Sequence, residues 1–319
     1  MKNEKKTVNT VKVRHVEVTE LVDLQRLDNY LIKIWKGVPK SHIYRLIRGG
    51  NVRINGSRCK PSQKLNTGDT IRLPPVRTSN KDQIVNADHP QVLRKCTLYE
   101  DNSILVINKP SGIAVHGGSK ISGNVIDALR YFRNPDQFLE LVHRLDKDTS
   151  GCLVLAKNLP TLRKLHKAFA RQSTDSISKT YLALLAGHWT NGPREVQLKL
   201  TKNISVSGDK KTSIDDKGQH AVSNFIPIRQ YDGCVFVKVE LRTGRMHQIR
   251  SHAAAIGNPV IGDRKYGSII ANKKFRKMGL NRLFLHATEI KFFHPQTEKQ
   301  ITIKSDLPLN LNLIMEKLS

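Results

Sequence analysis

Near the N-terminus, apolar and polar positions alternate with helical spacing. Four apolar residues follow the spacing i, i+3, i+4 and i+7: Leu27, Tyr30, Leu31 and Ile34. This spacing predicts an amphipathic helix with one buried face. We expect a second short helix with Ser41 as its N-cap and an end at Gly49-Gly50, where a left-handed residue is favoured. The pair Asn55-Gly56 predicts a tight hairpin turn within a small strand set.

The remaining chain shows strand-like patterns separated by short helical stretches. The segment SILVIN predicts a buried strand, and VIDALRYF and LPTLRKLHKAFARQ have helical spacing. In VFVKVEL, four residues alternate onto one face: Val235, Val237, Val239 and Leu241. Strands joined by hairpins, with helices between them, favour an α+β domain on a mixed, mainly antiparallel sheet.

These patterns divide the chain into four parts. Residues 1–18 are polar and basic, and we expect a loose arm there; residues 19–76 form the small domain of helices and strands. Residues 77–95 lack periodicity and are expected to be a linker, and residues 96–319 form the α+β domain. Within that domain, residues 202–220 are polar. We expect a hairpin excursion or a flexible loop there and assign it no chemistry.

Charge limits the partners of the chain. Its 319 residues are enough for one large domain and a small one, and 54 Lys and Arg against 27 Asp and Glu give a formal net charge of +27. Such an excess opposes compactness, and it suits a polyanionic partner. Nucleic acid is the first candidate, and an acidic membrane surface is the alternative.

Sequence motifs exclude several other classes of protein. No apolar run reaches the roughly 18 residues that cross a bilayer, and the first residues lack the apolar core of a signal peptide. The cysteines lie far apart, so neither a zinc site nor a disulfide framework is indicated: Cys59, Cys96, Cys152 and Cys234. The nucleotide-binding patterns GxGxxG and GxxxxGK[ST] are missing. We therefore expect a cytoplasmic protein.

The small domain carries positive charge on the polar positions of its helices and hairpin. Six of these residues are candidates for RNA contact: Lys40, Arg45, Arg48, Arg53, Arg58 and Lys60. A solvated surface is the alternative, since exposed helices commonly carry lysine and arginine. The segment from RLDNYL to GDTIRL resembles the small RNA-binding (alpha-L) domain of ribosomal small-subunit protein S-four and of tyrosyl-tRNA synthetases.

The segment HRLDKDTSG, residues 143–151, places several charges between the apolar runs FLELV and CLVLA. A neighbouring arginine favours the ionised form of a carboxylate. Asp146 and Asp148, close to Arg144, are therefore candidates for a nucleophile or an electrostatic stabiliser rather than a general acid. An aspartate that only caps a turn is the alternative.

The segment RTGRMHQIRSH, residues 242–252, is a second concentration of charge after a strand. In one interpretation it is a phosphate-binding patch, with Arg245 and His247 among its RNA contacts. In the other, one of its arginines pairs with an aspartate of HRLDKDTSG and keeps it ionised. His247 and His252 have no acidic or cysteine ligand nearby in the sequence, which argues against a metal site.

Four segments, in their order along the chain, resemble the signature motifs of the RluA-type pseudouridine synthases: NKPSGIAVHGG, HRLDKDTSG, KTYLAL and TGRMHQIRSH. With the small N-terminal domain included, the resemblance spans nearly the whole chain. It implies a pseudouridine synthase catalytic domain with an added RNA-binding domain. Within the family, the match is closest to members that modify the 23S ribosomal RNA of the large subunit, which implies ribosomal RNA as the partner.

The resemblance also assigns roles to residues. Asp146 matches the catalytic aspartate of the family, whereas Asp148 does not. Arg144 matches the arginine that helps to occupy the space left by a flipped base, and phosphate contact is its alternative. Tyr181 matches the active-site tyrosine, which stacks on uracil and helps to deprotonate carbon 5; a core residue is its alternative. Arg250 matches the basic residue that pairs with the catalytic aspartate.

The reaction implied by the resemblance breaks the bond from uracil to ribose, rotates the base and rejoins it through carbon 5. It involves no net redox change and no hydrolysis, so we expect no cofactor and no metal. The sequence does not choose among three roles of Asp146: attack on the anomeric carbon, addition to the ring, or removal of a ribose proton.

Two other functions compete with this interpretation. A glycosidase also places a carboxylate beside a glycosidic bond, but it needs a second carboxyl group as acid, which a strongly basic setting disfavours. A non-catalytic RNA-binding protein on a synthase scaffold is the second alternative. Nothing in the sequence indicates a dimer seam, so we expect a monomer.

Overall fold

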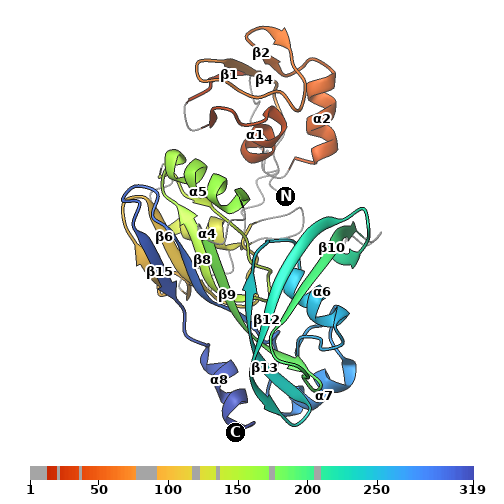
Figure 1. Cartoon of the computed structure of the whole chain (residues 1–319). Coiled ribbons are helices and arrows are strands. Elements are labelled where there is room, and N and C mark those ends of the chain that lie inside the picture. Colours follow the sequence, from red (N-terminus) through yellow and green to blue (C-terminus); the bar gives the residue numbers. More distant parts are fainter. Residues whose placement is uncertain are drawn as a thin grey trace, which may run out of the picture. The chain divides into compact units, whose positions relative to one another are not determined.

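The computed structural model of the chain contains two compact units, Met1–Ile84 and Val85–Ser319, each with its own hydrophobic core (Figure 1). The structure describes residues 13–19, 22–35, 38–76, 92–116, 123–133, 137–171, 177–204 and 210–319. Among these residues, no helix is long and apolar enough to cross a membrane.

The N-terminal unit packs two helices, α1 (Leu27–Ile34) and α2 (Lys40–Arg48), on a four-stranded sheet. The strands pair in the order β1-β4-β2-β3, and they span Arg14–Glu17 (β1), Arg53–Ile54 (β2), Ser57–Arg58 (β3) and Thr70–Leu73 (β4). Asn55 and Gly56 have φ angles of 49° and 77° and join β2 to β3. The predicted hairpin turn is confirmed, since a turn of this kind needs positive φ at both residues.

The prediction of a loose arm over residues 1–18 is wrong for its C-terminal end. Arg14–Glu17 pairs antiparallel with β4, and Val18 is 1% exposed in the core of the N-terminal unit. Hydrogen bonds to the sheet and burial of a valine therefore order this stretch. The first part of the expected arm, residues 1–12, lies outside the described residues.

Two details of the predicted helices are also wrong. Helix α2 begins at Lys40 rather than after Ser41, because the carbonyl of Pro39 already accepts a hydrogen bond from the amide of Ile43. Ser41 thus lies in the first turn of α2. Ile34, at the end of α1, is 37% exposed and does not join the buried face. The left-handed residue predicted after α2 is found at Gly50, whose φ is 71°.

The C-terminal unit contains an 11-stranded sheet among its described residues. Its main path has the order β11-β10-β12-β13-β9-β14-β8-β6-β5, with β15 paired to β14 and β7 to β8. Among the strands of the described residues only β14 and β8 pair in parallel, which confirms the predicted mixed, mainly antiparallel sheet. The strands are Thr97–Glu100 (β5), Ile104–Lys109 (β6), Glu140–Leu141 (β7), Ser150–Ala156 (β8), Ile177–Ala186 (β9), Arg194–Ile204 (β10), Lys210–Ile214 (β11), Gln219–Tyr231 (β12), Cys234–Leu241 (β13), Leu285–Phe293 (β14) and Gln300–Lys304 (β15).

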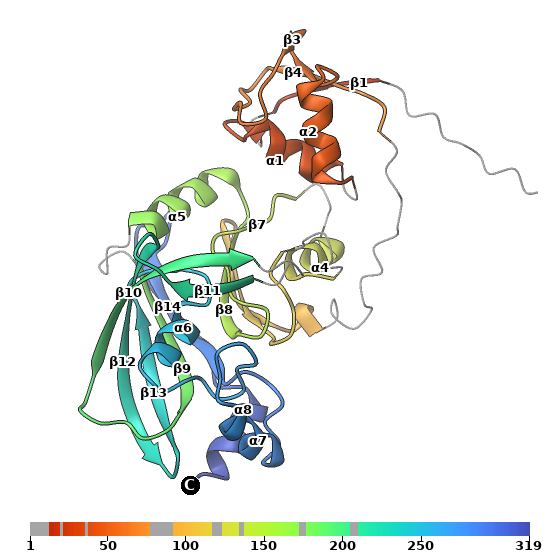
Figure 2. The ribbon, with the colours of Figure 1, turned by 90° about the vertical axis from the view of Figure 1, so that its right-hand side faces the viewer.

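Helices cover both faces of this sheet (Figure 2). The helices are α4 (Val125–Phe132), α5 (Leu159–Arg171), α6 (Gln248–Ala255), α7 (Ile269–Lys277) and α8 (Leu309–Glu316). On β6, Leu105 and Ile107 belong to the cluster that includes α4 and α6, whereas Ile104 and Val106 belong to the cluster that includes α5. Alternate residues of one strand thus reach two cores, as expected for a strand that is buried on both faces.

The polar stretch 202–220 forms part of a hairpin. Strands β10 and β11 pair antiparallel with Leu200 opposite Ile214, and residues 205–209 lie outside the described residues. The hairpin alternative of the sequence prediction is therefore the one that the structure supports.

The linker expected over residues 77–95 extends too far. Leu93 is fully buried and belongs to the main core of the C-terminal unit. Burial of its apolar side chain attaches this end of the segment to the C-terminal unit. Residues 77–91 lie outside the described residues.

Candidate active site

The segment HRLDKDTSG forms the loop between β7 and β8. Leu145 is 4% exposed and packs in the main core, whereas Arg144 and Asp148 are exposed. The side chain of Asp146 retains 17% exposure. The amide of Thr149 donates a hydrogen bond of 3.2 Å to the carbonyl of Asp146 and closes a turn. One apolar anchor thus holds a loop whose charged residues stay outside the core.

Gly151 determines how closely this loop can join the sheet. Its φ is 114°, and a Cβ atom at this position would overlap the carbonyl oxygen of Ala287 on β14. Gly151 and Ala287 are partners in the parallel pairing of β8 with β14. Only glycine allows the two strands to approach this closely, so it fixes the start of β8 and the position of the loop before it.

A buried lysine connects the loop to the NKPSG segment. Lys109 is 0% exposed, and its Nζ donates hydrogen bonds of 2.7, 2.9 and 3.1 Å to the carbonyls of Pro110, Ile113 and Lys147. Burial lowers the pKa of Lys109 to about 7, while the three carbonyl oxygens stabilise its charged form. Because Lys147 follows Asp146 directly, this contact holds the backbone beside the aspartate.

Arg250, on α6, reaches the carboxylate of Asp146. Its Nη1 lies 3.3 Å from Oδ2 of Asp146, while its Nε and Nη2 donate to Oδ2 and Oδ1 of Asp263 at 2.6 and 2.8 Å. Burial opposes ionisation of Asp263, but the hydrogen bonds from Arg250 outweigh it and lower the pKa of Asp263. A planar guanidinium can satisfy one carboxylate with two N–H groups and still present a third to Asp146.

His247 lies beside the same carboxylate. Its Nε2 is 3.9 Å from Oδ2 of Asp146, and its Nδ1 is 2.9 Å from the hydroxyl of Tyr266. As the N-cap of α6 it has φ 52° and ψ 23°, a left-handed conformation that costs a non-glycine residue about 1 kcal/mol. Burial lowers the pKa of His247, so its imidazole is neutral at neutral pH.

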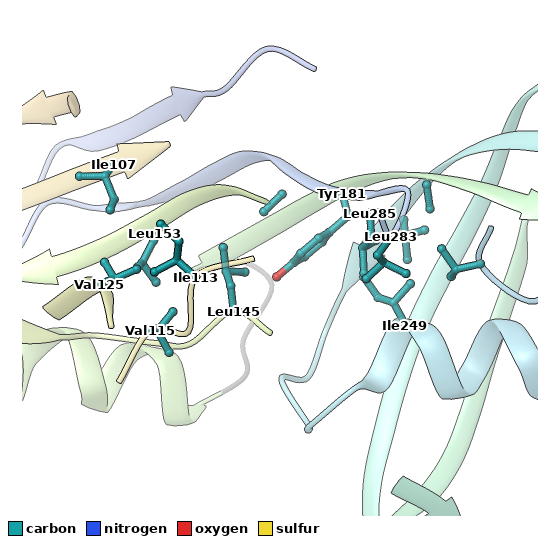
Figure 3. Close-up of a cluster of buried hydrophobic side chains, with 14 of the residues drawn as sticks. Ile107, Ile113, Val115, Val125, Leu145, Leu153, Tyr181, Ile249, Leu283 and Leu285 are labelled. Carbon is teal, nitrogen blue, oxygen red and sulfur yellow. The ribbon is translucent and has the colours of Figure 1, made fainter. Parts of the chain in front are cut away.

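Two further side chains come from β9. Tyr181 is 7% exposed, and Figure 3 shows its ring reaching from β9 toward Leu145, with the hydroxyl at the near end. Burial, reinforced by the charge of Asp146, raises the pKa of Tyr181, so the phenol stays protonated. Burial and the charge of Arg245 lower the pKa of Lys179 to about 8.

These groups surround a cavity of about 290 Å³. It lies between the HRLDKDTSG loop, β9 and the start of α6, and its lining includes all six residues that the sequence assigned to this unit: Arg144, Asp146, Tyr181, Arg245, His247 and Arg250. At about 30 Å³ for each water, the volume corresponds to roughly ten water molecules, which is room for a single pyrimidine base. Asp148, exposed and outside the lining, is not part of this arrangement.

The other predicted contacts lie on the N-terminal unit. All six residues are exposed: Lys40, Arg45, Arg48, Arg53, Arg58 and Lys60. Across the described residues of both units, no group of three His, Cys, Asp or Glu side chains is placed to hold a metal ion.

Sequence reasoning missed four residues of the cavity and its support: Lys109, Lys179, Asp263 and Tyr266. A signal existed for Lys179, since it precedes Tyr181 by two positions in a strand and must point to the same side of the sheet. Asp263 and Tyr266 lie in the loop IGDRKYG, which reads as an ordinary turn. Only the folded chain shows that this loop meets Arg250.

Comparison with known proteins identifies the class to which this fold and cavity belong. The family model described as RNA pseudouridylate synthase matches residues 103–255, and the model described as S4 domain matches residues 25–71. The solved structure of human RNA pseudouridylate synthase domain containing 4 has a TM-score of 0.58 at 23% identity. It covers 72% of this chain and 95% of that chain.

Relatives of similar length extend the match to nearly the whole chain. The protein named ribosomal large subunit pseudouridine synthase C of Haemophilus influenzae is 41% identical over 99% of this chain and 98% of its own length. The protein of the same name from Escherichia coli strain K12 is 42% identical over 97% of this chain and 98% of its own length. This chain belongs to the RNA pseudouridylate synthase family, whose members are isomerases that act on RNA.

Asp263→Asn should lower the free energy of unfolding by about 3 kcal/mol, because it leaves the buried charge of Arg250 without its main partner. Since the folded state lowers the pKa of Asp263, its contribution is present above about pH 4 and is lost as the pH falls through the folded value. The difference between wild type and variant should therefore shrink in acid. Chemical denaturation at pH 7 and pH 3 measures both effects.

The control for this prediction is Asp232→Asn. Asp232 pairs with Lys274 at 3.2 Å on the surface, where its side chain is fully exposed, so the unfolding midpoint should not change. Equal midpoints for Asp263→Asn and Asp232→Asn would contradict a structural role of the buried pair.

Proposed function

We propose that this protein converts specific uridines of large-subunit 23S ribosomal RNA to pseudouridine, with Asp146 as the catalytic carboxylate and without a cofactor. One observation carries the proposal. The cavity places Asp146, Arg250 and Tyr181 together, in a chain that matches relatives named for this activity over 97–99% of its length. The substrate follows from the names of these relatives, and the roles of the residues follow from the family resemblance together with their geometry.

The reaction rearranges one nucleotide without loss of atoms. The bond from ribose C1′ to uracil N1 breaks, the base turns, a bond forms from C1′ to C5, C5 loses a proton and N1 gains one. Electrons balance without an oxidant or reductant, so no redox cofactor is needed. A carboxylate at Asp146 can attack C1′, add to the ring or remove a ribose proton. Each of these routes needs the oxygen to be held close to the nucleotide.

The nucleotide must leave its stack to reach Asp146. Arg144 is exposed and lines the cavity, two residues before Asp146. A planar guanidinium can stack on the neighbouring bases and fill the space that the uridine leaves. We assign this role to Arg144.

Tyr181 has two possible contacts with a bound uracil. Its ring is placed to stack on the base, which requires no change in protonation. Since burial keeps its phenol protonated, the hydroxyl can help to remove the C5 proton only by passing its own proton on at the same time. Tyr181 therefore acts as a neutral relay and not as a phenolate base.

The N-terminal unit supplies affinity in this proposal. Its six exposed basic residues contact phosphates and recognise RNA shape, while the cavity performs the chemistry. The protein acts as a monomer in the cytoplasm, where ribosomal RNA is its partner.

Asp146→Asn should reduce pseudouridine formation in 23S ribosomal RNA by more than about 10³-fold, because the amide can neither attack nor accept a proton as the carboxylate does. Asp148→Asn is the matched control, and it should retain nearly full activity since Asp148 is exposed beside the cavity. Mapping of pseudouridines after incubation with each variant gives the result. Comparable activity of wild type and Asp146→Asn would contradict the assignment, and an inactive wild type would favour a binding protein.

The double variant Arg48→Ala/Arg58→Ala should weaken RNA binding about 10-fold near physiological salt and leave kcat at saturating RNA unchanged. Each lost phosphate contact should reduce the slope of log Kd against log salt by about 1. The double variant Arg48→Lys/Arg58→Lys keeps both charges and should keep the slope. A loss of kcat with unchanged Kd would place these residues in the chemistry instead.

A further inference from the structure

A series of polar contacts runs from the β10–β11 hairpin to the carboxylate of Asp146. The amide of Thr212, on β11, donates to the hydroxyl oxygen of Tyr266 at 2.6 Å. That hydroxyl lies 2.9 Å from Nδ1 of His247, whose Nε2 faces Oδ2 of Asp146 at 3.9 Å. The sequence pattern indicates no chemistry for this hairpin and only RNA contact for His247.

The groups at the two ends of this series, the amide of Thr212 and the carboxylate of Asp146, limit where the protons between them can lie. A backbone amide can only donate, so the Tyr266 oxygen accepts from Thr212 and has its own proton left to give. The hydroxyl proton of Thr212 is already used, because its Oγ1 donates to the carbonyl of Met246 at 2.9 Å. Nδ1 of His247, 2.9 Å away, can accept that proton, and Oγ1 of Thr212 is a second acceptor beside the same oxygen. When Tyr266 donates to Nδ1, a neutral imidazole carries its proton on Nε2.

The other end of the imidazole requires the same tautomer. Nε2 faces an oxygen of Asp146, and a carboxylate has only lone pairs to offer. A proton on Nε2 makes this contact attractive, whereas a lone pair there would be repelled. Asp146 and Asp263 favour protonation of the ring, but burial together with Arg250 and Lys265 keeps His247 neutral.

Tyr266 is held by contacts with Arg250, Lys211 and Asp263. Its ring lies under the guanidinium of Arg250 at 5.2 Å and the ammonium of Lys211 at 5.4 Å, measured to the ring centroid. Its amide also donates to Oδ1 of Asp263 at 3.1 Å. Asp263, which binds Arg250, thus also holds the partner of His247.

We propose that His247 is a positioning residue that donates its Nε2–H group to Oδ2 of Asp146, in a tautomer fixed by Tyr266 and Thr212. The inference rests on the proposed function, since it assigns the support of the same carboxylate. The separation of 3.9 Å in the free protein shortens when RNA fills the cavity, as catalytic hydrogen bonds commonly do. Arg250 and His247 both face Oδ2 of Asp146. Among the described residues no hydrogen bond reaches Oδ1 of Asp146, so this oxygen is left for the nucleotide.

The tautomer can be measured in the intact free protein. Spectra of protein with 15N-labelled histidine should show His247 with a protonated Nε2 and an unprotonated Nδ1 at pH 7, assigned by the loss of these signals in His247→Gln. Tyr266→Phe keeps the ring but removes the hydroxyl, and it should shift His247 toward a mixture of tautomers. A proton on Nδ1, or a doubly protonated ring at pH 7 in the wild type, would overturn the proposal.

The kcat of two His247 variants distinguishes a positioning role of this residue from a packing role. His247→Gln retains an N–H donor near the position of Nε2, whereas the side chain of His247→Asn is one methylene shorter and cannot reach Asp146. Loss of a hydrogen bond to a charged group should lower kcat of His247→Asn about 10- to 100-fold, with KM for RNA nearly unchanged and His247→Gln within about 5-fold of wild type. Equal kcat for the Gln and Asn variants would overturn the donor role. An inactive wild type with the expected tautomer would instead reject the function and leave the hydrogen-bond chain intact.

Discussion

The guanidinium of Arg250 is the group on which the catalytic unit depends. It is bound by two N–H groups to Asp263 and presents a third to Asp146, so one side chain from α6 aligns two loops that are 117 residues apart in sequence, at 146 and 263. Two charges removed from water are stable only when their hydrogen bonds are complete. Asp263 completes those of Arg250, and the resulting rigid pair gives Asp146 a fixed donor.

Features set by neighbouring residues could be predicted from the sequence. The hairpin at Asn55-Gly56 follows from the tolerance of both residues for positive φ, and the continuous apolar run SILVIN predicts the buried strand β6. The charges of HRLDKDTSG also indicated a site, because a buried-strand connection rarely carries so many. Ser41 was misjudged as an N-cap since Pro39 starts the helix earlier, an effect decided by one backbone carbonyl.

The residues that support the active site could not be predicted from the sequence in this way. Asp263 and Tyr266 come from one loop and Thr212 from a strand at the sheet edge, and their meeting point depends on strand order and register. No periodicity of the chain encodes that order. The hairpin that holds Thr212 looked like an insertion without chemistry, yet its backbone amide orients a hydroxyl next to the imidazole beside Asp146. Polar networks of this kind are visible only in three dimensions.

The central claim is that Arg250 holds Asp146 for the reaction, and Arg250→Lys tests it most directly. Lysine keeps the positive charge but cannot bind Asp263 with two N–H groups while it reaches Asp146. Pseudouridine formation in 23S ribosomal RNA at saturating RNA should fall at least about 100-fold, while the Kd for RNA changes by less than about 3-fold. Turnover close to that of the wild type in a folded Arg250→Lys variant would contradict the account.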